Sequence, residues 1–252
     1  MSSISSLPRH DDFTWLRRVF EAFCIAAAIA LLIWNLARIV AAPELLNWWL
    51  LLPIVGGMAA ADIVSGLVHW LADTWGTETM PILGRRFVRP FRVHHVNPDD
   101  FLRRSFLDTN GDVAMIIGVF LLAALSIPLT STVGQAVSVF VVSFCVAGLP
   151  TNQVHQWAHM RHPPRWVRWL QDRGVILSRA RHQLHHRRPY AMNYCIATGW
   201  CNGLLTRIDF FRRLEAVVTW VTGLTPRADD SAFQTSVEDI RRAEPRQGPG
   251  DR

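Results

Sequence analysis

The 252-residue chain contains no lysine, and all 26 of its basic residues are arginine. With 20 acidic residues it has a formal net charge of +6 and a pI near 10. Such a charge can indicate nucleic-acid binding, but the basic residues then form a stripe on a soluble domain. Here the arginines border apolar stretches. We therefore expect them to contact anionic lipid headgroups and expect no nucleic-acid partner.

Cysteine is scarce as well. The four cysteines have no C-x-x-C spacing, and Cys24 and Cys145 lie inside apolar stretches. Cys195 and Cys201 are expected on a reducing side of the membrane, where they would not form a disulfide. All four are interpreted as apolar filler.

Long apolar runs are abundant, by contrast, and half of the residues are hydrophobic. Four runs are long enough to predict membrane spans: residues 21–42, 46–70, 112–128 and 133–150. Each of the first two can cross about 30 Å of hydrocarbon as a helix. A signal peptide does not explain the first run, because roughly twenty polar residues precede it and its core exceeds the usual length. The sequence predicts an all-α integral membrane bundle of about four transmembrane helices.

The arginines predict the orientation of these spans. They precede the first span, separate the second from the third, and follow the fourth. The turn between the first and second spans has only Arg38 and Glu44 at its edge. Short cytoplasmic loops carry the excess of basic residues, so both termini are expected in the cytoplasm. The all-arginine basic set favours a GC-rich bacterium and its inner membrane. In a eukaryote the corresponding membrane would be the endoplasmic reticulum.

Three segments are expected along the chain. Residues 1–20 form a cytoplasmic N-terminal segment, residues 21–225 a membrane-embedded domain, and residues 226–252 a charged, disordered tail. Within the domain, residues 202–223 are amphipathic, and we expect an interfacial helix there.

Nine of the ten histidines fall on the predicted cytoplasmic side. His155 and His159 are four residues apart, so a helix places them on one face. His182 can converge in the same way with either His185 or His186. Histidine at an interface can simply contact headgroups or a backbone carbonyl, but eight at one membrane depth predict a metal site.

The nature of the metal follows from the number of ligands. Eight imidazoles exceed what one tetrahedral zinc can use, so we expect two metal ions. Iron is favoured because it can activate oxygen, whereas zinc has no redox chemistry. His10 lies in a polar N-terminal segment and His162 beside two prolines, and neither is placed in the site.

Five motifs resemble the Kua/CarF family of membrane lipid desaturases, which includes animal plasmanylethanolamine desaturase and a plastid fatty-acid desaturase. The similarity runs from about Asp62 to Glu215 with order and spacing kept. The motifs are Ser65-Gly66-Leu67-Val68-His69-Trp70 with Asp73-Thr74-Trp75-Gly76; Arg89-Pro90-Phe91-Arg92-Val93-His94-His95; Thr109-Asn110-Gly111-Asp112; Thr151-Asn152-Gln153-Val154-His155-Gln156-Trp157-Ala158-His159; and His182-Gln183-Leu184-His185-His186 running to Gly199-Trp200-Cys201-Asn202.

The resemblance implies a di-iron desaturase that uses O2 and electrons from a carrier such as cytochrome b5 or ferredoxin. Its animal members convert alkyl ether phospholipid to vinyl ether phospholipid. Asp73 is implied as a ligand or as a partner of a ligand, although it can instead pair with Arg85, Arg86 or Arg92. The implied iron ligands are His69, His94, His95, His155, His159, His182, His185 and His186.

Several alternatives remain open from the sequence. They are a fatty-acyl desaturase acting near the carboxyl end of a phospholipid acyl chain, a di-iron lipid hydroxylase, and a zinc hydrolase or non-enzymatic metal-binding membrane protein. No residue is assigned to substrate binding. Arg104 and Asn97 lie where the chain departs from the animal pattern, and these positions are expected to shape the headgroup site.

Overall fold

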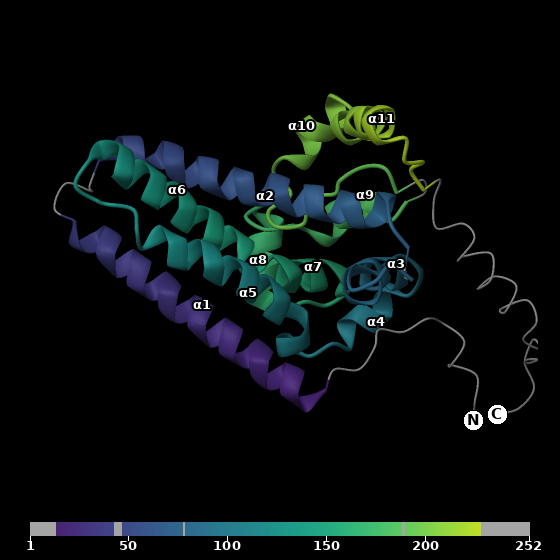
Figure 1. The fold of residues 1–252 in the computed structure, drawn as a ribbon, viewed down its shortest axis with the longest axis horizontal. Coiled ribbons are helices and arrows are strands. Elements are labelled where there is room, and N and C mark those ends of the chain that lie inside the picture. Colours follow the sequence, from purple (N-terminus) through teal and green to yellow (C-terminus); the bar gives the residue numbers. More distant parts are fainter. Residues whose placement is uncertain (1–13, 43–46, 78, 188–189, 228–252) are drawn as a thin grey trace, which may run out of the picture.

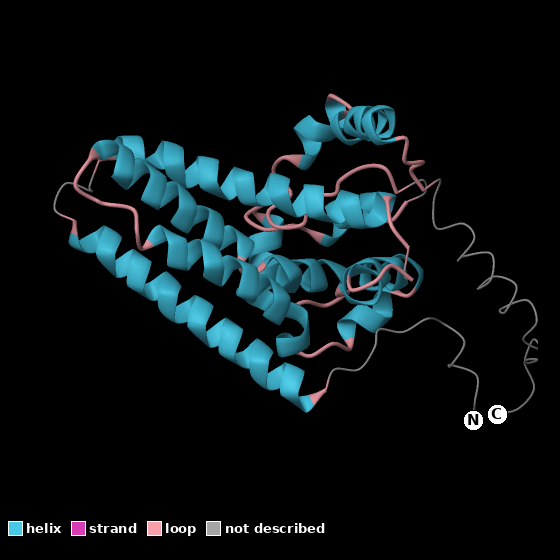
Figure 2. Cartoon of the chain, in the orientation of Figure 1, coloured by secondary structure: helices cyan, strands magenta, loops and turns pink. Residues whose placement is uncertain are grey.

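The computed structural model describes residues 14–42, 47–77, 79–187 and 190–227, and these form helices joined by loops, with no strand among them (Figure 2). The elements are α1 (Trp15–Ala41), η1 (Trp48–Leu50), α2 (Leu51–Thr74), η2 (Gly84–Val88), α3 (Arg89–Val96), α4 (Pro98–Leu102), α5 (Phe106–Ala124), α6 (Thr132–Gly148), α7 (Thr151–His159), α8 (Arg165–Asp172), α9 (Arg179–His185), α10 (Asn202–Arg207) and α11 (Phe210–Thr222).

The long helices form a bundle in which α1 packs along α5, α5 contacts α6, and α6 packs along α2 (Figure 1). The close approach of α1 and α5 depends on Gly111, because a Cβ at that position would lie 2.3 Å from Cγ of Glu21. Cys24, Ile117, Leu121 and neighbouring apolar side chains fill the space between these helices. The three short helices α3, α7 and α9 gather at one end of the bundle (Figure 1).

Four helical segments are long and apolar enough to cross a membrane: Trp15–Ala41, Trp48–Thr74, Phe106–Ala124 and Thr132–His159. The prediction of four crossings in an all-α bundle is therefore confirmed, and the protein is a multi-pass membrane protein. Several of these boundaries differ from the expected ones, however, and the fourth segment ends at His159 rather than at residue 150 because α7 continues it. The first helix begins at Trp15 rather than at residue 21, because Arg17 is neutralised by Glu21 at 2.8 Å and by Asp112 at 3.2 Å.

The second and third helices also extend beyond the expected apolar runs. The second helix continues past Trp70 to Thr74, which brings Asp73 into the helix. The third begins at Phe106 rather than at residue 112, because Ser105 caps it by accepting a hydrogen bond from the Asp108 amide. Both extensions carry polar residues that a search for apolar runs passes over.

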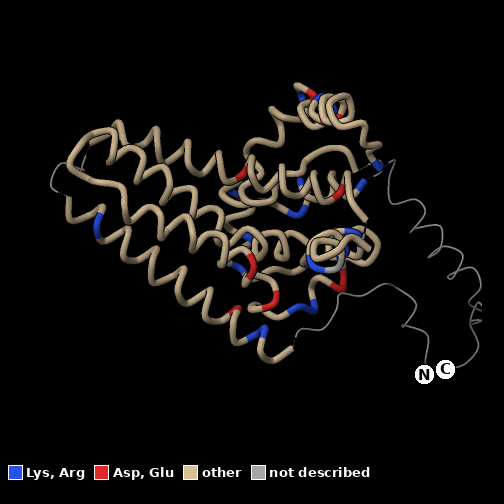
Figure 3. Tube along the Cα trace, viewed as in Figure 1, with Lys and Arg blue, Asp and Glu red and all other residues tan. Residues whose placement is uncertain are grey.

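Charged residues concentrate at the end of the bundle that holds α3, α4, α7 and α9, which we call the charged end (Figure 3). At the opposite end Arg38 donates to the backbone carbonyls of Ala124 (3.1 Å) and Ile127 (2.9 Å). The first of these carbonyls belongs to the last turn of α5 and the second follows it, and a cation is favourable at this end of a helix. Arg38 therefore caps the C-terminal end of α5. Its presence at this end of the bundle does not contradict the concentration of charged residues at the other end.

The expected interfacial helix over residues 202–223 is present as two helices, α10 and α11, because Asp209 adopts a left-handed conformation with φ of +53° and breaks the path. The pair lies beside the bundle rather than within it (Figure 1). Only Phe211 of α11 is buried, while Trp220 and Val221 are exposed. An apolar exposed face on a short helix suits the membrane interface.

Residues 1–13 of the expected N-terminal segment, with His10, lie outside the described residues. The same holds for residues 228–252 of the expected disordered tail.

Candidate metal centre

Four elements bring the eight implied histidine ligands and Asp73 together inside the charged end. His69 and Asp73 lie in the last turns of α2, His94 and His95 end α3, His155 and His159 belong to α7, and the remaining three come from α9 and its C-terminal cap. All eight histidines are buried or half-buried. The side chains form two groups, and within each group the potential ligand atoms lie within 4.8 Å of one another.

The first group contains five imidazoles and is centred on His182. Its Nε2 atom lies 2.9 Å from Nε2 of His155, 2.7 Å from that of His159 and 3.0 Å from that of His186. Nε2 of His94 lies 3.1 Å from Nε2 of His186. A neutral imidazole carries only one N–H. The Nε2 atoms of five imidazoles therefore cannot all satisfy one another by hydrogen bonding. A cation between them would use their lone pairs.

The second group contains three imidazoles and one carboxylate. Oδ2 of Asp73 lies 3.4 Å from Nε2 of His69, 3.5 Å from Nε2 of His95 and 3.4 Å from Nε2 of His185. Both oxygens of Asp73 and Nε2 of His69 are buried and make no hydrogen bond within the described part of the chain. Buried polar atoms without partners are costly, and a metal ion would satisfy all of them at once.

Each pair of adjacent histidines is divided between the two groups. His94 joins the first group and His95 the second, and likewise His186 joins the first and His185 the second. The two short helices α3 and α9 therefore hold both groups in a fixed relation. The ring of His69 in the second group also lies 5.5 Å from that of His155 in the first, so the groups are neighbours.

Backbone carbonyls fix the orientation of two imidazoles. Nδ1 of His69 lies 3.1 Å from the carbonyl oxygen of Tyr194, and Nδ1 of His185 lies 2.9 Å from that of Met192. Since a carbonyl can only accept, Nδ1 donates in both cases and Nε2 is left as an acceptor directed into the site. This is the arrangement that metal-binding histidines commonly show.

Burial sets the protonation of the histidines outside the spans. Burial and the neighbouring imidazoles hold the pKa of His94, His182 and His186 well below the usual 6.5. Burial also lowers the pKa of His95, partly offset by the carboxylate of Asp73. These side chains are neutral at pH 7, which is the form that binds metal.

The alternative of an Asp73 ion pair with arginine is not what the structure contains. Arg92 donates to the backbone carbonyl of Asp73 (2.9 Å), and Arg86 pairs with Asp112 (2.7 Å). The side chain of Arg85 lies outside the described part. His162 belongs to neither group and is exposed.

A loop that follows the last histidines supports the site, and its role was not visible in the sequence. The buried carboxylate of Asp62 accepts hydrogen bonds from the backbone amides of Thr198 (2.8 Å), Gly199 (2.8 Å) and Cys201 (3.0 Å). The loop therefore lies against α2, where it supplies the carbonyl that orients His69. Asp62 was noted only as the start of the similar region, because its partners are more than 130 residues away.

Close packing holds this loop at the same place. A Cβ at Gly66 would come within 2.7 Å of Sγ of Cys195. Burial raises the pKa of the Cys195 thiol and raises the pKa of the Cys201 thiol to about 11, and Asp62 adds to both effects. The two thiols are thus protonated packing groups, in keeping with their interpretation as filler.

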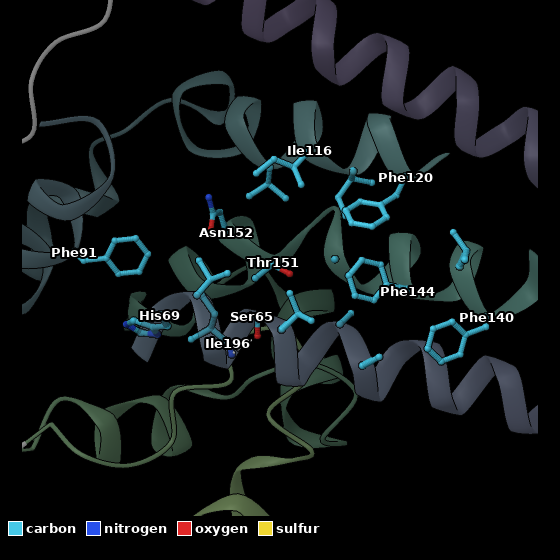
Figure 4. Close-up of a pocket in the computed structure, with 18 residues that line it drawn as sticks. Ser65, His69, Phe91, Ile116, Phe120, Phe140, Phe144, Thr151, Asn152 and Ile196 are labelled. Carbon is cyan, nitrogen blue, oxygen red and sulfur yellow. Dashed lines mark hydrogen bonds between the residues drawn. The ribbon is translucent and has the colours of Figure 1, made fainter. Parts of the chain in front are cut away.

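An apolar cavity of about 490 Å³ leads from the second group into the bundle. His69 and Phe91 lie at one end of it, and Phe120, Phe140 and Phe144 lie toward the other (Figure 4). Along α2 the lining runs from His69 back to Ala60, nine residues or about 13 Å of helix. The volume and the lining suit one hydrocarbon chain.

Comparison with known proteins identifies the family of the chain. The lipid desaturase domain family matches residues 58–229. The chain belongs to the lipid desaturase family. It is 39% identical over 213 residues to the plasmanylethanolamine desaturase of Myxococcus xanthus, covering 84% of this chain and 76% of that one. It is 38% identical over 234 residues to plasmanylethanolamine desaturase 1 of Mus musculus, covering 87% and 84% of the two chains.

A chloroplastic fatty acid desaturase 4 of Arabidopsis thaliana is 35% identical over 175 residues, which covers 68% of this chain and 52% of the plant protein. No solved structure matches the chain. The predicted family is therefore confirmed, and this lipid desaturase is an oxidoreductase of membrane lipid metabolism. A zinc hydrolase and a non-enzymatic metal-binding protein are set aside by the same finding.

Proposed function

We propose that this lipid desaturase converts plasmanyl (alkyl ether) phospholipid to plasmenyl (vinyl ether) phospholipid, the step that forms plasmalogens. The apolar cavity that begins beside His69 carries the proposal, because it would place one hydrocarbon chain with its first carbons next to the metal centre. The names of the relatives from Myxococcus and mouse point to the same substrate.

Two iron ions fit the residues of the centre. One would be held by the five-histidine group and the other by His69, His95, His185 and Asp73. When bound, iron supplies an oxidant able to remove hydrogen from an unactivated carbon, which no side chain can do. Overall, O2, two electrons and two protons take two hydrogen atoms from the lipid and leave one C=C bond and two water molecules.

The protein's own residues place the chain and keep water out. Apart from Ser65, His69, Thr151 and Asn152, the lining of the cavity is apolar, and it includes Val64, Phe120 and Phe144. A chain seated there presents its headgroup-proximal carbons at the level of His69. Oxidation far along the chain is disfavoured, because those carbons would lie about 13 Å or more away along α2.

The orientation and the partners follow from the charged end. We infer that this end faces the cytoplasm, with both termini on that side, and that the membrane is a bacterial inner membrane or, in a eukaryote, the endoplasmic reticulum. Electrons come from an external carrier such as cytochrome b5 or ferredoxin. Exposed arginines beside α8 offer that carrier a surface.

The proposal is tested by lipid mass spectrometry in cells that lack vinyl ether lipids, fed an alkyl ether lipid and supplied with an electron carrier. The cells express the wild type, His155→Ala or the control His162→Ala. We expect acid-labile vinyl ether lipid from the wild type and from the control, and none from His155→Ala. The control removes an exposed histidine outside both groups.

Other products would select other reactions. An unsaturated acyl chain with the ether lipid untouched would indicate an acyl desaturase, and a lipid heavier by one oxygen would indicate a hydroxylase. Folded, iron-loaded protein that forms no vinyl ether with a competent carrier would overturn the proposed substrate.

A further inference from the structure

A second cavity of about 330 Å³ adjoins the apolar one at the charged end. The two cavities share five lining residues, namely Val68, Phe91, Val113, Ile116 and Asn152. The second differs in having charged side chains in its lining, namely Arg17, Arg86, Arg89, Arg104, Asp108 and Asp112. A cavity with charged side chains that adjoins an apolar cavity has the form expected of a site for an amphipathic ligand.

The charged lining comes from separate elements. Arg17 belongs to α1, Arg86 to η2, Arg104 to the loop before α5, and Asp112 to α5. Asp112 lies between two of the cavity arginines, at 3.2 Å from Arg17 and 2.7 Å from Arg86.

The balance of charge in the cavity favours a ligand with an anionic group. Four arginines and two aspartates line it, and Glu21, which is not part of the lining, pairs with Arg17 at 2.8 Å. The carboxylate of Asp108 is also shared with Arg18, which is not part of the lining, at 3.2 Å. Burial lowers the pKa of Arg104, which donates to the backbone carbonyl of Asp108 at 2.6 Å. An anion inside the cavity would be stabilised by this excess of positive charge.

We propose that this cavity binds the zwitterionic headgroup of the phospholipid substrate, with the phosphate on Arg86, Arg89 and Arg104 and the ammonium group on Asp112. The inference rests on the proposed function for the ether-linked chain, and it adds the residues that recognise the headgroup. Arg86 and Asp112 have side chains that are 51% and 41% exposed, so exchanging their mutual ion pair for contacts with the ligand costs little.

The residues that line both cavities determine how far along them the lipid lies. A headgroup among the arginines and a chain along Phe120 and Phe144 require the glycerol and the first chain carbons to pass Val68 and Phe91. The ring of Phe91 lies 5.3 Å from that of His69, so the ether-linked carbons would pass beside the metal centre. Headgroup recognition and the position of the reacting bond are thus set by one arrangement.

A free phosphate ion offers the same anionic chemistry as the headgroup, and the ion pairs can also serve only to fasten α1 to α5. Binding measurements separate these cases and require neither iron nor turnover. Full-length protein in detergent is mixed with equal amounts of alkyl ether lipids that carry ethanolamine, choline or glycerol headgroups. The bound lipids are then quantified by native mass spectrometry.

We expect the wild type to retain the ethanolamine lipid about tenfold over the anionic glycerol lipid, the scale of one charge-assisted hydrogen bond. Arg86→Gln should lower the affinity for all three lipids about tenfold. Asp112→Asn should remove the preference for ethanolamine over glycerol. The control Arg207→Gln removes an exposed arginine of α10 outside both cavities and should change neither value.

Because Arg104 is half-buried, it is changed to lysine (Arg104→Lys), which keeps the positive charge and removes the planar guanidinium group. Melting temperatures verify that each variant folds. Wild-type binding by both Arg86→Gln and Asp112→Asn would overturn the proposal. So would displacement of bound lipid by millimolar inorganic phosphate alone. A protein that binds lipid as expected but forms no vinyl ether would instead overturn the proposed reaction and leave the headgroup site standing.

Discussion

Asp73 is the residue whose chemistry differs from the rest of the metal centre. It contributes a carboxylate at 3.4–3.5 Å from three Nε2 atoms. Asp73→Asn removes a negative charge from the second group and leaves the five-histidine group intact. We expect the iron content to fall from about two ions per chain toward one, with at least a tenfold loss of activity, as measured by elemental analysis and turnover.

The matched control is Asp99→Asn, because Asp99 is exposed and lies outside both groups. It should retain both ions. Two ions per chain in Asp73→Asn would show that the carboxylate only orients its neighbours and is not a ligand.

At the same scale, the nine residues that the family resemblance implied are the ones that the structure gathers into the two groups within its described part. The four-residue step correctly placed His155 with His159. It left open whether His182 converges with His185 or with His186, and the structure pairs it with His186 at 3.0 Å. That choice depends on how α9 rotates against α7 and α3, which spacing within one helix does not contain.

At the scale of elements, Asp62 joins α2 to the loop of residues 190–201. The Asp62 carboxylate accepts hydrogen bonds from three backbone amides. In Asp62→Asn the side-chain N–H group would face at least one of these three donors. We expect a loss of about 2 kcal/mol of stability and a lower melting temperature. Iron retention should fall as well, because the same loop orients His69 and His185.

The control for this change is Asp172→Asn at the exposed end of α8. It should leave both the melting temperature and the iron content at wild-type values. Wild-type iron retention in Asp62→Asn would mean that the loop holds its position without this anchor.

Helix α2 also sets the depth of the apolar cavity. Ala60 lines the cavity about 13 Å from His69, so Ala60→Phe would fill its inner part. We expect turnover of long-chain lipids to fall about tenfold while short-chain lipids are less affected, in a competition assay between chain lengths. Val55→Phe is the control, because Val55 is 53% exposed on the same helix and lies outside the cavity. Equal losses for all chain lengths would contradict the assignment of the cavity.

The elements themselves were predictable where hydrophobicity decides them. Four apolar runs gave four spans, but the polar extensions at Trp15 and Phe106 were missed because ion pairs and a serine cap support them. The break at Asp209 was missed for a related reason. A left-handed residue is set by the packing of α10 and α11, and no glycine marks the position.

At the scale of the whole molecule, the distribution of arginine predicts orientation. The loop around residues 129–131 carries no charge, whereas the charged end carries many arginines. A cysteine introduced at Thr130 should react with a membrane-impermeant maleimide added outside the cell. A cysteine introduced at Thr79, in the loop after α2, should react only after the membrane is opened. The reverse labelling would invert the proposed topology.

The distribution of arginine also affects how an electron carrier would bind. Arg165 and Arg168 are exposed on α8, and Arg179 donates to the backbone carbonyl of His159 beside the five-histidine group. A carrier with an acidic surface would therefore be steered toward this face, and its association rate should fall as salt rises. We expect Arg165→Glu with Arg168→Glu to slow reduction by the carrier at least tenfold at low salt.

This double variant should leave iron content and lipid binding unchanged, and the difference from wild type should shrink at high salt. The control Arg207→Glu has one comparable charge change on α10, away from this face. Rapid-mixing spectroscopy of the reduced carrier measures the rate directly. Equal salt dependence in the wild type and the double variant would show that electrons enter elsewhere, since the charges that steer a partner must be those that face it.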